Sequence, residues 1–286
     1  MQVKVDPAAL KEKLQHIVGE RNPFSSPHRL AQVEDYVERE FKDCGLVVES
    51  HFFKYSGKTY RNIIGRLGGG GKAPLIIVGA HLDSVEGTPG ADDNASGLAV
   101  LLEAARILAN LKPRSPALFC AFNLEEQNMI GSGHFVRKLK SEEAKVEGMI
   151  SLEMVGYTDR RPGSQKYPIG LKWFYPDQGD FIAVVGNFRS TGFLRKFARV
   201  MRQAPGLPVE TLLVPGNGFL IPEARLSDHA PFWDAGYPAL LVTDTSFFRN
   251  PHYHGSTDKL ETLDLGFMAK VCEGVVTAVV DWEGRG

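Results

Sequence analysis

Five residues of metal-binding type are spread along this chain, and together they form a ligand set for two divalent ions. They are His81, Asp93, Glu126, Glu153 and His254, each in or just after a segment with the pattern of a buried strand or its loop. A pair of zinc ions, roughly 3.5–4 Å apart, is held when one carboxylate bridges them and each ion gains one more imidazole and carboxylate. Two imidazoles and three carboxylates suit zinc first, and cobalt or manganese are also compatible. The residue types therefore predict hydrolytic chemistry.

The residues beside these candidates are of the kinds that support a metal site. Asp83 lies two residues beyond His81, on the same side of an extended chain. It can accept the proton of the imidazole nitrogen that binds no metal. In the string PGADDNASG (89–97), Asp93 is the candidate bridge, and Asp92 is expected to face solvent or cap a helix.

Two adjacent acids, Glu125 and Glu126, are expected to divide two tasks. Neighbouring residues in irregular backbone can point in different directions, so one can bind a metal while the other reaches the attacking water. We assign Glu126 to the metal and Glu125 to the general base, which takes the water's proton and passes it to the leaving amine. An exposed acidic pair is the alternative interpretation.

Alternating strand and helix patterns carry these residues. The apolar runs 74–81 and 116–123 are typical of strands buried on both faces. The order predicts a three-layer α/β/α sandwich with a mostly parallel central sheet, in a single domain over 1–286. Ligands of such sheets gather at the carboxyl ends of the strands, where the candidates fall. Further strands are predicted at 147–155, 181–187, 208–214 and 238–244, and helices at 94–110, 131–140, 190–203 and 263–282.

The first 45 residues are expected to form helices that pack on this core. The run Gly68–Gly71 is interpreted as a turn and not a phosphate loop, because neither a lysine-serine pair nor a helix follows it. Segment 158–178 is the one long irregular stretch, and such loops often border a site. Before the core, helices are predicted at about 6–20 and from Pro27, and strands at 46–54 and 61–67.

Composition narrows the class of partner. The 286 residues carry 33 basic and 34 acidic side chains, a net charge of −1, without a basic block. Nucleic acid and membrane are therefore poor partner candidates, and no apolar run approaches the roughly 18 residues that span a bilayer. The start of the chain shows no signal-peptide pattern, and Cys44, Cys120 and Cys272 predict no disulfide framework, so a cytoplasmic location is expected. Oligomeric state stays open.

Six strings in order make this chain resemble the co-catalytic zinc aminopeptidases, a family that includes secreted bacterial leucine aminopeptidases, glutamate carboxypeptidases and, more distantly, glutaminyl cyclases. The resemblance covers roughly 60–282 and implies a zinc-exopeptidase fold. The strings are GAHLDS (79–84), PGADDNASG (89–97), NLEEQ (123–127), SLEMVGY (151–157), LSDHAPFWDAGYPAL (226–240) and PHYHGSTD (251–258).

The resemblance assigns roles to individual residues. It implies one metal held by His81, Asp93 and Glu153, and the other by Asp93, Glu126 and His254. It makes Glu125 the base and Asp83 the partner of His81. It also implies a cis peptide bond between Asp93 and Asn94.

Two departures from the family pattern concern the same site. Family members commonly have aspartate where this chain has Glu153, and the tyrosine that some place before the SDH string is absent. Tyr253 is therefore our candidate for stabilising the oxyanion, and Arg225 is a weaker one that could instead pair with a carboxylate. Ser227, Asp228 and His229 are expected either to support the site or to cap a helix.

The predicted function is that of a zinc aminopeptidase acting on a peptide or aminoacyl substrate. Three rivals stay open: a glutaminyl cyclase-like acyltransferase, a carboxypeptidase, and a non-catalytic receptor-like binding module. The carboxypeptidase needs a cationic pocket, for which Arg189, Arg195 and Arg225 are available. For an apolar side-chain pocket the loop candidates are Phe219, Leu220, Ile221, Phe247 and Phe248.

Overall fold

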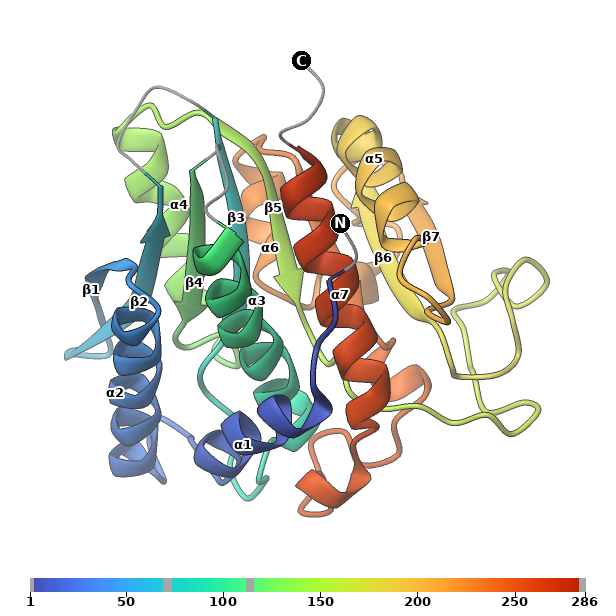
Figure 1. Ribbon diagram of the computed structural model, residues 1–286, viewed down its shortest axis with the longest axis horizontal. Coiled ribbons are helices and arrows are strands. Elements are labelled where there is room, and N and C mark those ends of the chain that lie inside the picture. Colours follow the sequence, from blue (N-terminus) through green and yellow to red (C-terminus); the bar gives the residue numbers. More distant parts are fainter. Residues whose placement is uncertain (1–2, 69–73, 112–115, 283–286) are drawn as a thin grey trace.

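A computed structural model describes residues 3–68, 74–111 and 116–282. Within them, eight strands form one sheet in the order β1-β2-β4-β3-β5-β8-β6-β7, with helices on both faces (Figure 1). The predicted three-layer α/β/α sandwich is thereby confirmed. The strands are β1 (Val47–Tyr55), β2 (Lys58–Leu67), β3 (Leu75–His81), β4 (Ala117–Phe122), β5 (Val146–Leu152), β6 (Ile182–Asn187), β7 (Val209–Val214) and β8 (Ala239–Thr243). The helices are α1 (Pro7–Ile17), α2 (Pro27–Asp43), α3 (Gly97–Leu111), α4 (Ile130–Ser141), α5 (Thr191–Met201), α6 (His229–Asp234) and α7 (Leu265–Asp281).

The centre of the sheet is parallel. β4, β3, β5 and β8 run in one direction, so their carboxyl ends share an edge. The pairings β1–β2, β2–β4 and β6–β8 are antiparallel. Side chains alternate between the faces of a strand, and in β3 this sends Val78 into one hydrophobic core and Ile77 into the other. Both faces of β3 are therefore buried, which explains the continuous apolar run in its sequence.

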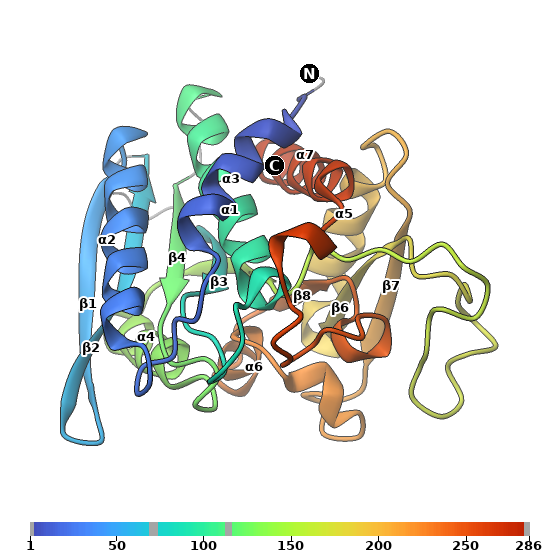
Figure 2. The same ribbon diagram turned by 90° about the horizontal axis from the view of Figure 1, so that it is seen from below.

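Helices α3, α5 and α7 cover one face of the sheet, and α4 and α6 cover the other (Figures 1 and 2). The N-terminal helix α1 packs against α3 and α7, and α2 packs against β1, β2 and α3. Segment 158–178 extends beyond β7 at the edge of the sheet (Figure 2). The Tyr175 hydroxyl ties this segment to β7 by donating to the Thr211 carbonyl over 2.9 Å.

Element boundaries differ from the predicted ones where the site begins. The helix expected from residue 94 starts at Gly97, because Asp93 and Asn94 in the preceding turn, Ala91–Ser96, have non-helical dihedral angles. The strand expected over 147–155 ends at Leu152, which leaves Glu153 just beyond it. Most of the turn at Gly68–Gly71 lies outside the described residues.

Two further sequence expectations can be compared with the fold. Across the described residues, no helix has both the length and the apolar character needed to cross a membrane. Cys44, Cys120 and Cys272 are free thiols, and Cys120 is fully buried as a small apolar side chain.

Candidate active site

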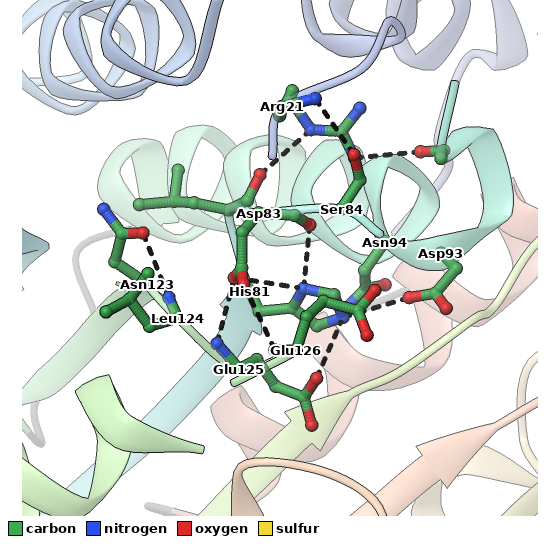
Figure 3. Close-up of polar contacts among 12 residues, drawn as sticks. Arg21, His81, Asp83, Ser84, Asp93, Asn94, Asn123, Leu124, Glu125 and Glu126 are labelled. Carbon is green, nitrogen blue, oxygen red and sulfur yellow. Dashed lines mark hydrogen bonds and ion pairs between the residues drawn. The ribbon is translucent and has the colours of Figure 1, made fainter. Parts of the chain in front are cut away.

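The carboxyl edge of the sheet brings the candidate residues together. His81 is the last residue of β3, Glu153 follows β5 directly, and Glu126 lies in the loop after β4. Asp93 comes from the turn between β3 and α3, and His254 from the loop after β8. Figure 3 shows His81 and Asp93 beside the Glu125–Glu126 pair. Residues up to 173 positions apart in the sequence, His81 and His254, thus share one site.

Donor atoms of these five residues form two groups of three. His81 Nε2 lies 3.1 Å from Asp93 Oδ1 and 3.4 Å from Glu153 Oε1. His254 Nε2 lies 3.1 Å from Asp93 Oδ2 and 3.5 Å from Glu126 Oε2. Within each group the three donor atoms lie within 4.8 Å of one another. Asp93 therefore offers one oxygen to each group, which is the arrangement that a bridging carboxylate requires.

Asp83 organises both His81 and the adjacent acids. The Nδ1 atom of His81 lies 3.1 Å from the Asp83 backbone carbonyl and 3.7 Å from its Oδ1. A carbonyl can only accept, so this contact puts the imidazole proton on Nδ1 and leaves Nε2 free to bind a metal. The Asp83 carboxylate itself accepts the backbone N–H groups of Glu125 and Glu126, over 3.0 and 3.1 Å. The aspartate thus also fixes the loop that carries the expected base.

The turn that presents Asp93 is held from both sides. The Asp93–Asn94 peptide bond is cis, as the resemblance implied. The Asp258 carboxylate accepts the backbone N–H groups of Asp92 and Asp93. The Asn94 side chain donates to the Leu152 carbonyl over 2.8 Å and accepts the backbone N–H of Met154, which brackets Glu153. Asp93 and Glu153 are therefore fixed relative to each other.

Arg21, which no sequence pattern singles out, joins the N-terminal segment to the site. Its side chain is fully buried, and its guanidinium donates to the carbonyls of Leu82, Gly19, Pro89 and Gly90 over 2.8–2.9 Å. Leu82 lies between His81 and Asp83, and Gly90 begins the turn to Asp93. Figure 3 shows Arg21 above the Asp83–Ser84 segment. This one cation therefore clamps two of the chain segments that carry candidate ligands.

The electrostatics of the site indicate an excess of negative charge. Burial, together with repulsion from Asp93, raises the pKa of Glu126 and of Glu153 to about 7. Burial alone would lower the pKa of His254, but hydrogen bonds to Asp93 and Glu126 raise it to about 10. Glu126, Glu153 and His254 therefore hold protons more tightly than usual, whereas the two imidazoles beside Asp93 lower the pKa of its carboxyl, so cations are favoured among these acids. Within the described residues, the buried Oε1 of Glu126 also has no hydrogen-bond partner. The donor set thus fits two divalent ions.

Glu125 is placed differently from its neighbour. Its Oε2 lies 3.9 Å from His81 Nε2, farther than the oxygens of Asp93 and Glu153. Burial raises the pKa of the Glu125 carboxyl well above its ordinary value, and the charges of Glu153 and Glu126 add to the shift. A largely buried carboxylate that borders the donor atoms but belongs to neither group is suited to exchange protons.

Strained backbone occurs at the same edge. Leu124, which precedes the acidic pair, has φ 58°; Met154, which follows Glu153, has φ 50°; and His254 itself has φ 54°. Residues other than glycine rarely adopt this left-handed region, and the cost is about 1–3 kcal/mol each. Such strain concentrates where the surroundings enforce a functional geometry.

One expectation about this region was wrong. Asp92 neither faces solvent nor caps a helix: it is fully buried, and its carboxylate accepts the Gly156 backbone N–H and the Asn250 side chain over 3.0 and 2.7 Å. Asp92 therefore ties the turn to the segments after β5 and β8. Its hydrogen-bond partners lie 64 and 158 residues away, so no local pattern could reveal them.

The residues near the SDH string have structural partners. Arg225 pairs with Asp234 over 2.7 Å, as its alternative interpretation allowed. Ser227 donates to Glu153 Oε2 over 2.9 Å and so supports a candidate ligand. Asp228 stands before α6, although its side chain caps no backbone N–H there. His229 Nε2 lies 2.8 Å from the Ala224 carbonyl, within the scaffold.

An apolar cavity of about 390 Å³ opens from the donor groups. Tyr253 and His254 border it, and the Tyr253 ring stacks on the His254 ring with a centroid separation of 3.7 Å. Of the expected pocket residues, Ile221, Phe247 and Phe248 line the cavity, whereas Phe219 and Leu220 are exposed outside it. Its described lining includes none of the arginines that a carboxypeptidase would need, which are Arg189, Arg195 and Arg225.

A layered α/β fold in which two groups of donor atoms share one carboxylate, here that of Asp93, is typical of a class of metal-dependent hydrolases. Within that class the chain belongs to peptidase family M28, whose model matches residues 62–279. The predicted zinc metallopeptidase class is confirmed by this membership and by the names of relatives, which include a probable zinc metalloprotease of Leptosphaeria maculans.

Individual relatives share the sequence and the fold to different degrees. The chain is 37% identical to the uncharacterized protein YfbL of Escherichia coli strain K12, over 95% of this chain and 87% of that protein. It is 30% identical to a probable leucine aminopeptidase of Arthroderma otae, over 83% of this chain but only 62% of that protein. The fold matches that of the LapA aminopeptidase of Legionella pneumophila with a TM-score of 0.78 and 22% identity, over 98% of this chain and 73% of that one.

Proposed function

We propose that this chain is an aminopeptidase that removes the N-terminal residue of peptides at a pair of zinc ions. The observation that carries the proposal is the position of Asp93, whose two oxygens lie 3.1 Å from His81 Nε2 and from His254 Nε2. One ion would be held by His81, Asp93 and Glu153, and the other by Asp93, Glu126 and His254. When bound, the ions would polarise the scissile carbonyl and lower the pKa of the attacking water.

Proton transfer falls to Glu125. Its raised pKa suits a group that takes a proton from water and returns it to the leaving amine. Asp83 accepts the Glu125 backbone N–H and so holds the base in place. Tyr253, which lines the cavity and stacks on the His254 ring, would donate a hydrogen bond from its hydroxyl to the developing oxyanion.

Substrate orientation follows from the shape of the site. The free α-amine of the peptide would lie among the carboxylates of the group formed by Asp93, Glu126 and His254. The side chain of the peptide's first residue would enter the apolar cavity. The rest of the peptide would extend into solvent. The predicted single domain over 1–286 and the cytoplasmic location remain predictions beside this proposal.

Blocked peptides test the proposal. Acetylation of a substrate's N-terminus should abolish cleavage, and amidation of its C-terminus should leave cleavage intact. The opposite pattern would favour a carboxypeptidase. Cleavage of doubly blocked peptides would exclude both activities.

Release of ammonia from an N-terminal glutamine peptide without peptide cleavage would favour a cyclase. A zinc-loaded protein that does none of these would support the non-catalytic binding module.

A further inference from the structure

The cavity beside the donor groups has a floor made of the sheet itself. Two cross-strand rows of side chains face it, because β8, β6 and β7 lie side by side and in register. Residues of segment 165–175 and of the loops after β7 and β8 line the rest of the cavity. The first row is Thr243, Ala183 and Glu210, and the second is Leu241, Val185 and Leu212.

Glu210 is the charged member of this floor. The other five floor residues are apolar or hydroxylic, and the neighbour of Glu210 in its row is the small Ala183. Two other charged residues that line the cavity, Lys166 and Glu223, are exposed and opposite in sign, whereas Glu210 is partly buried. A substrate side chain that reaches the end of this floor therefore meets a carboxylate.

We propose that the cavity receives the first side chain of a peptide and that Glu210 selects a long cationic side chain, lysine or arginine. The inference rests on the proposed aminopeptidase function. It names the substrate class: peptides whose first residue is basic. The apolar walls suit the methylene stem of such a side chain, and the acid suits its charged end.

The span between the donor groups and Glu210 fits a long side chain. Leu152 of β5 pairs with Val242 of β8, so Glu153 stands level with Thr243, the first residue of the row. Adjacent strands are about 4.8 Å apart, so the backbones of Glu153 and Glu210 are roughly 14 Å apart across three steps. The side chains of both acids shorten this gap. A short side chain such as alanine would leave Glu210 unreached, and a long unbranched one would span the cavity.

Nothing among the described residues neutralises Glu210 by direct contact. The nearby Tyr167 and Tyr175 hydroxyls donate to the carbonyls of Pro176 and Thr211 instead. Arg202, whose charge acts on Glu210 from a distance, donates to the Val209 carbonyl. Burial raises the pKa of Glu210, and a substrate cation beside it would reverse that shift.

Matched substrates and ligands test the inference. With zinc-loaded protein, kcat/KM should be at least about tenfold higher for arginyl and lysyl than for norleucyl p-nitroanilide, the size of effect expected for a charge-assisted hydrogen bond. Calorimetry should show free L-arginine binding more tightly than L-norleucine.

Glu210→Gln should remove both preferences while it retains cleavage of the norleucyl substrate, and Glu210→Lys should reverse them. Glu147→Gln, at a partly buried acid of β5 that does not line the cavity, should leave both ratios unchanged.

Separate outcomes distinguish this inference from the proposed function. Norleucyl cleavage equal to or faster than arginyl cleavage would overturn the role of Glu210 and leave the aminopeptidase standing. A Glu210→Gln protein with the same arginyl-to-norleucyl ratio of kcat/KM as the wild type would also overturn the role of Glu210 and leave the aminopeptidase standing. If no substrate is cleaved, the proposed function fails, and equal binding of the two free amino acids would then also refute the recognition of a cation.

Discussion

At the scale of single residues, Glu125 and Glu126 are neighbours with different surroundings. Glu126 Oε2 lies 3.5 Å from His254 Nε2 and belongs to a donor group, whereas Glu125 borders the other group without joining it. Both backbone N–H groups donate to Asp83, so one aspartate holds the backbone of both residues in place. This arrangement gives the two acids separable roles.

We expect Glu125→Gln to reduce kcat by at least about a hundredfold while metal content stays at the wild-type level, because proton transfer by a positioned group contributes about 10²–10⁴-fold. Glu126→Gln should instead weaken one metal, since an amide is a poorer ligand than a carboxylate. Metal analysis and steady-state kinetics on both variants measure the contrast. Metal loss in Glu125→Gln with only a slower rate in Glu126→Gln would invert the assignment.

Arg21 acts at the same scale through backbone carbonyls. Replacing it by methionine should lower the free energy of unfolding by at least about 3 kcal/mol, because several buried carbonyls lose a charged donor. Zinc affinity should fall as well, since the clamped segments carry His81 and Asp93. Arg29→Met is the matched control: Arg29 is only partly buried and donates to two carbonyls, those of His16 and Val18, in a segment that carries no candidate ligand. Equal effects of the two substitutions on zinc affinity would contradict the role of Arg21.

The sequence named the residues at the edge of the sheet but not those that hold them. His81, Asp93 and Glu153 stand out because acids and imidazoles follow apolar strand patterns. Arg21 and Asp258 act on backbone groups of segments far away in the chain, and such contacts leave no periodicity or motif in the sequence. The burial of Asp92 was missed for the same reason.

At the scale of elements, a close approach of backbones positions the site. A Cβ atom on Gly97 would lie 2.6 Å from the Leu152 carbonyl oxygen and would also collide with the Asn94 side chain. Both neighbours are next to candidate ligands, Glu153 and Asp93. The glycine at the start of α3 is therefore needed for space and not for an unusual dihedral angle, since its φ is −61°.

Gly97→Ala should consequently destabilise the protein by about 1–3 kcal/mol, the usual cost of forcing atoms into a packed interior. It should also weaken zinc binding. Gly192→Ala, near the start of α5, is the control: open space surrounds its added methyl, and alanine favours a helix by up to about 1 kcal/mol. Chemical denaturation of the two variants measures the difference. A Gly97→Ala protein as stable as Gly192→Ala would show that the approach of α3 to β5 is looser than described.

Element prediction succeeded where the pattern was long and failed where it was short. Apolar runs located β3 and β4, and helical spacing located α2 and α7. Helix α6 was not predicted, because a helical spacing over only six residues cannot be distinguished from a loop. The strand expected at 147–155 was three residues too long, because buried apolar residues continue past the end of β5.

At the scale of the whole molecule, the layers could be predicted and the strand order could not. Alternating strands and helices imply a sandwich, because each apolar face must be buried. The sequence does not say that β2 pairs antiparallel with β4, or that β6 reverses beside β8. These pairings matter for function, since they set β6 and β7 beside the donor groups and so form the floor of the cavity.

Zinc-edge anomalous diffraction from crystals of the zinc-loaded protein tests the central claim most directly. Two peaks roughly 3.5–4 Å apart are expected. One Asp93 oxygen should lie on each ion, with His81 and Glu153 at one peak and Glu126 and His254 at the other. A single peak at full zinc occupancy, or two peaks with Asp93 bound to only one of them, would contradict the bridged pair on which the proposed hydrolysis depends.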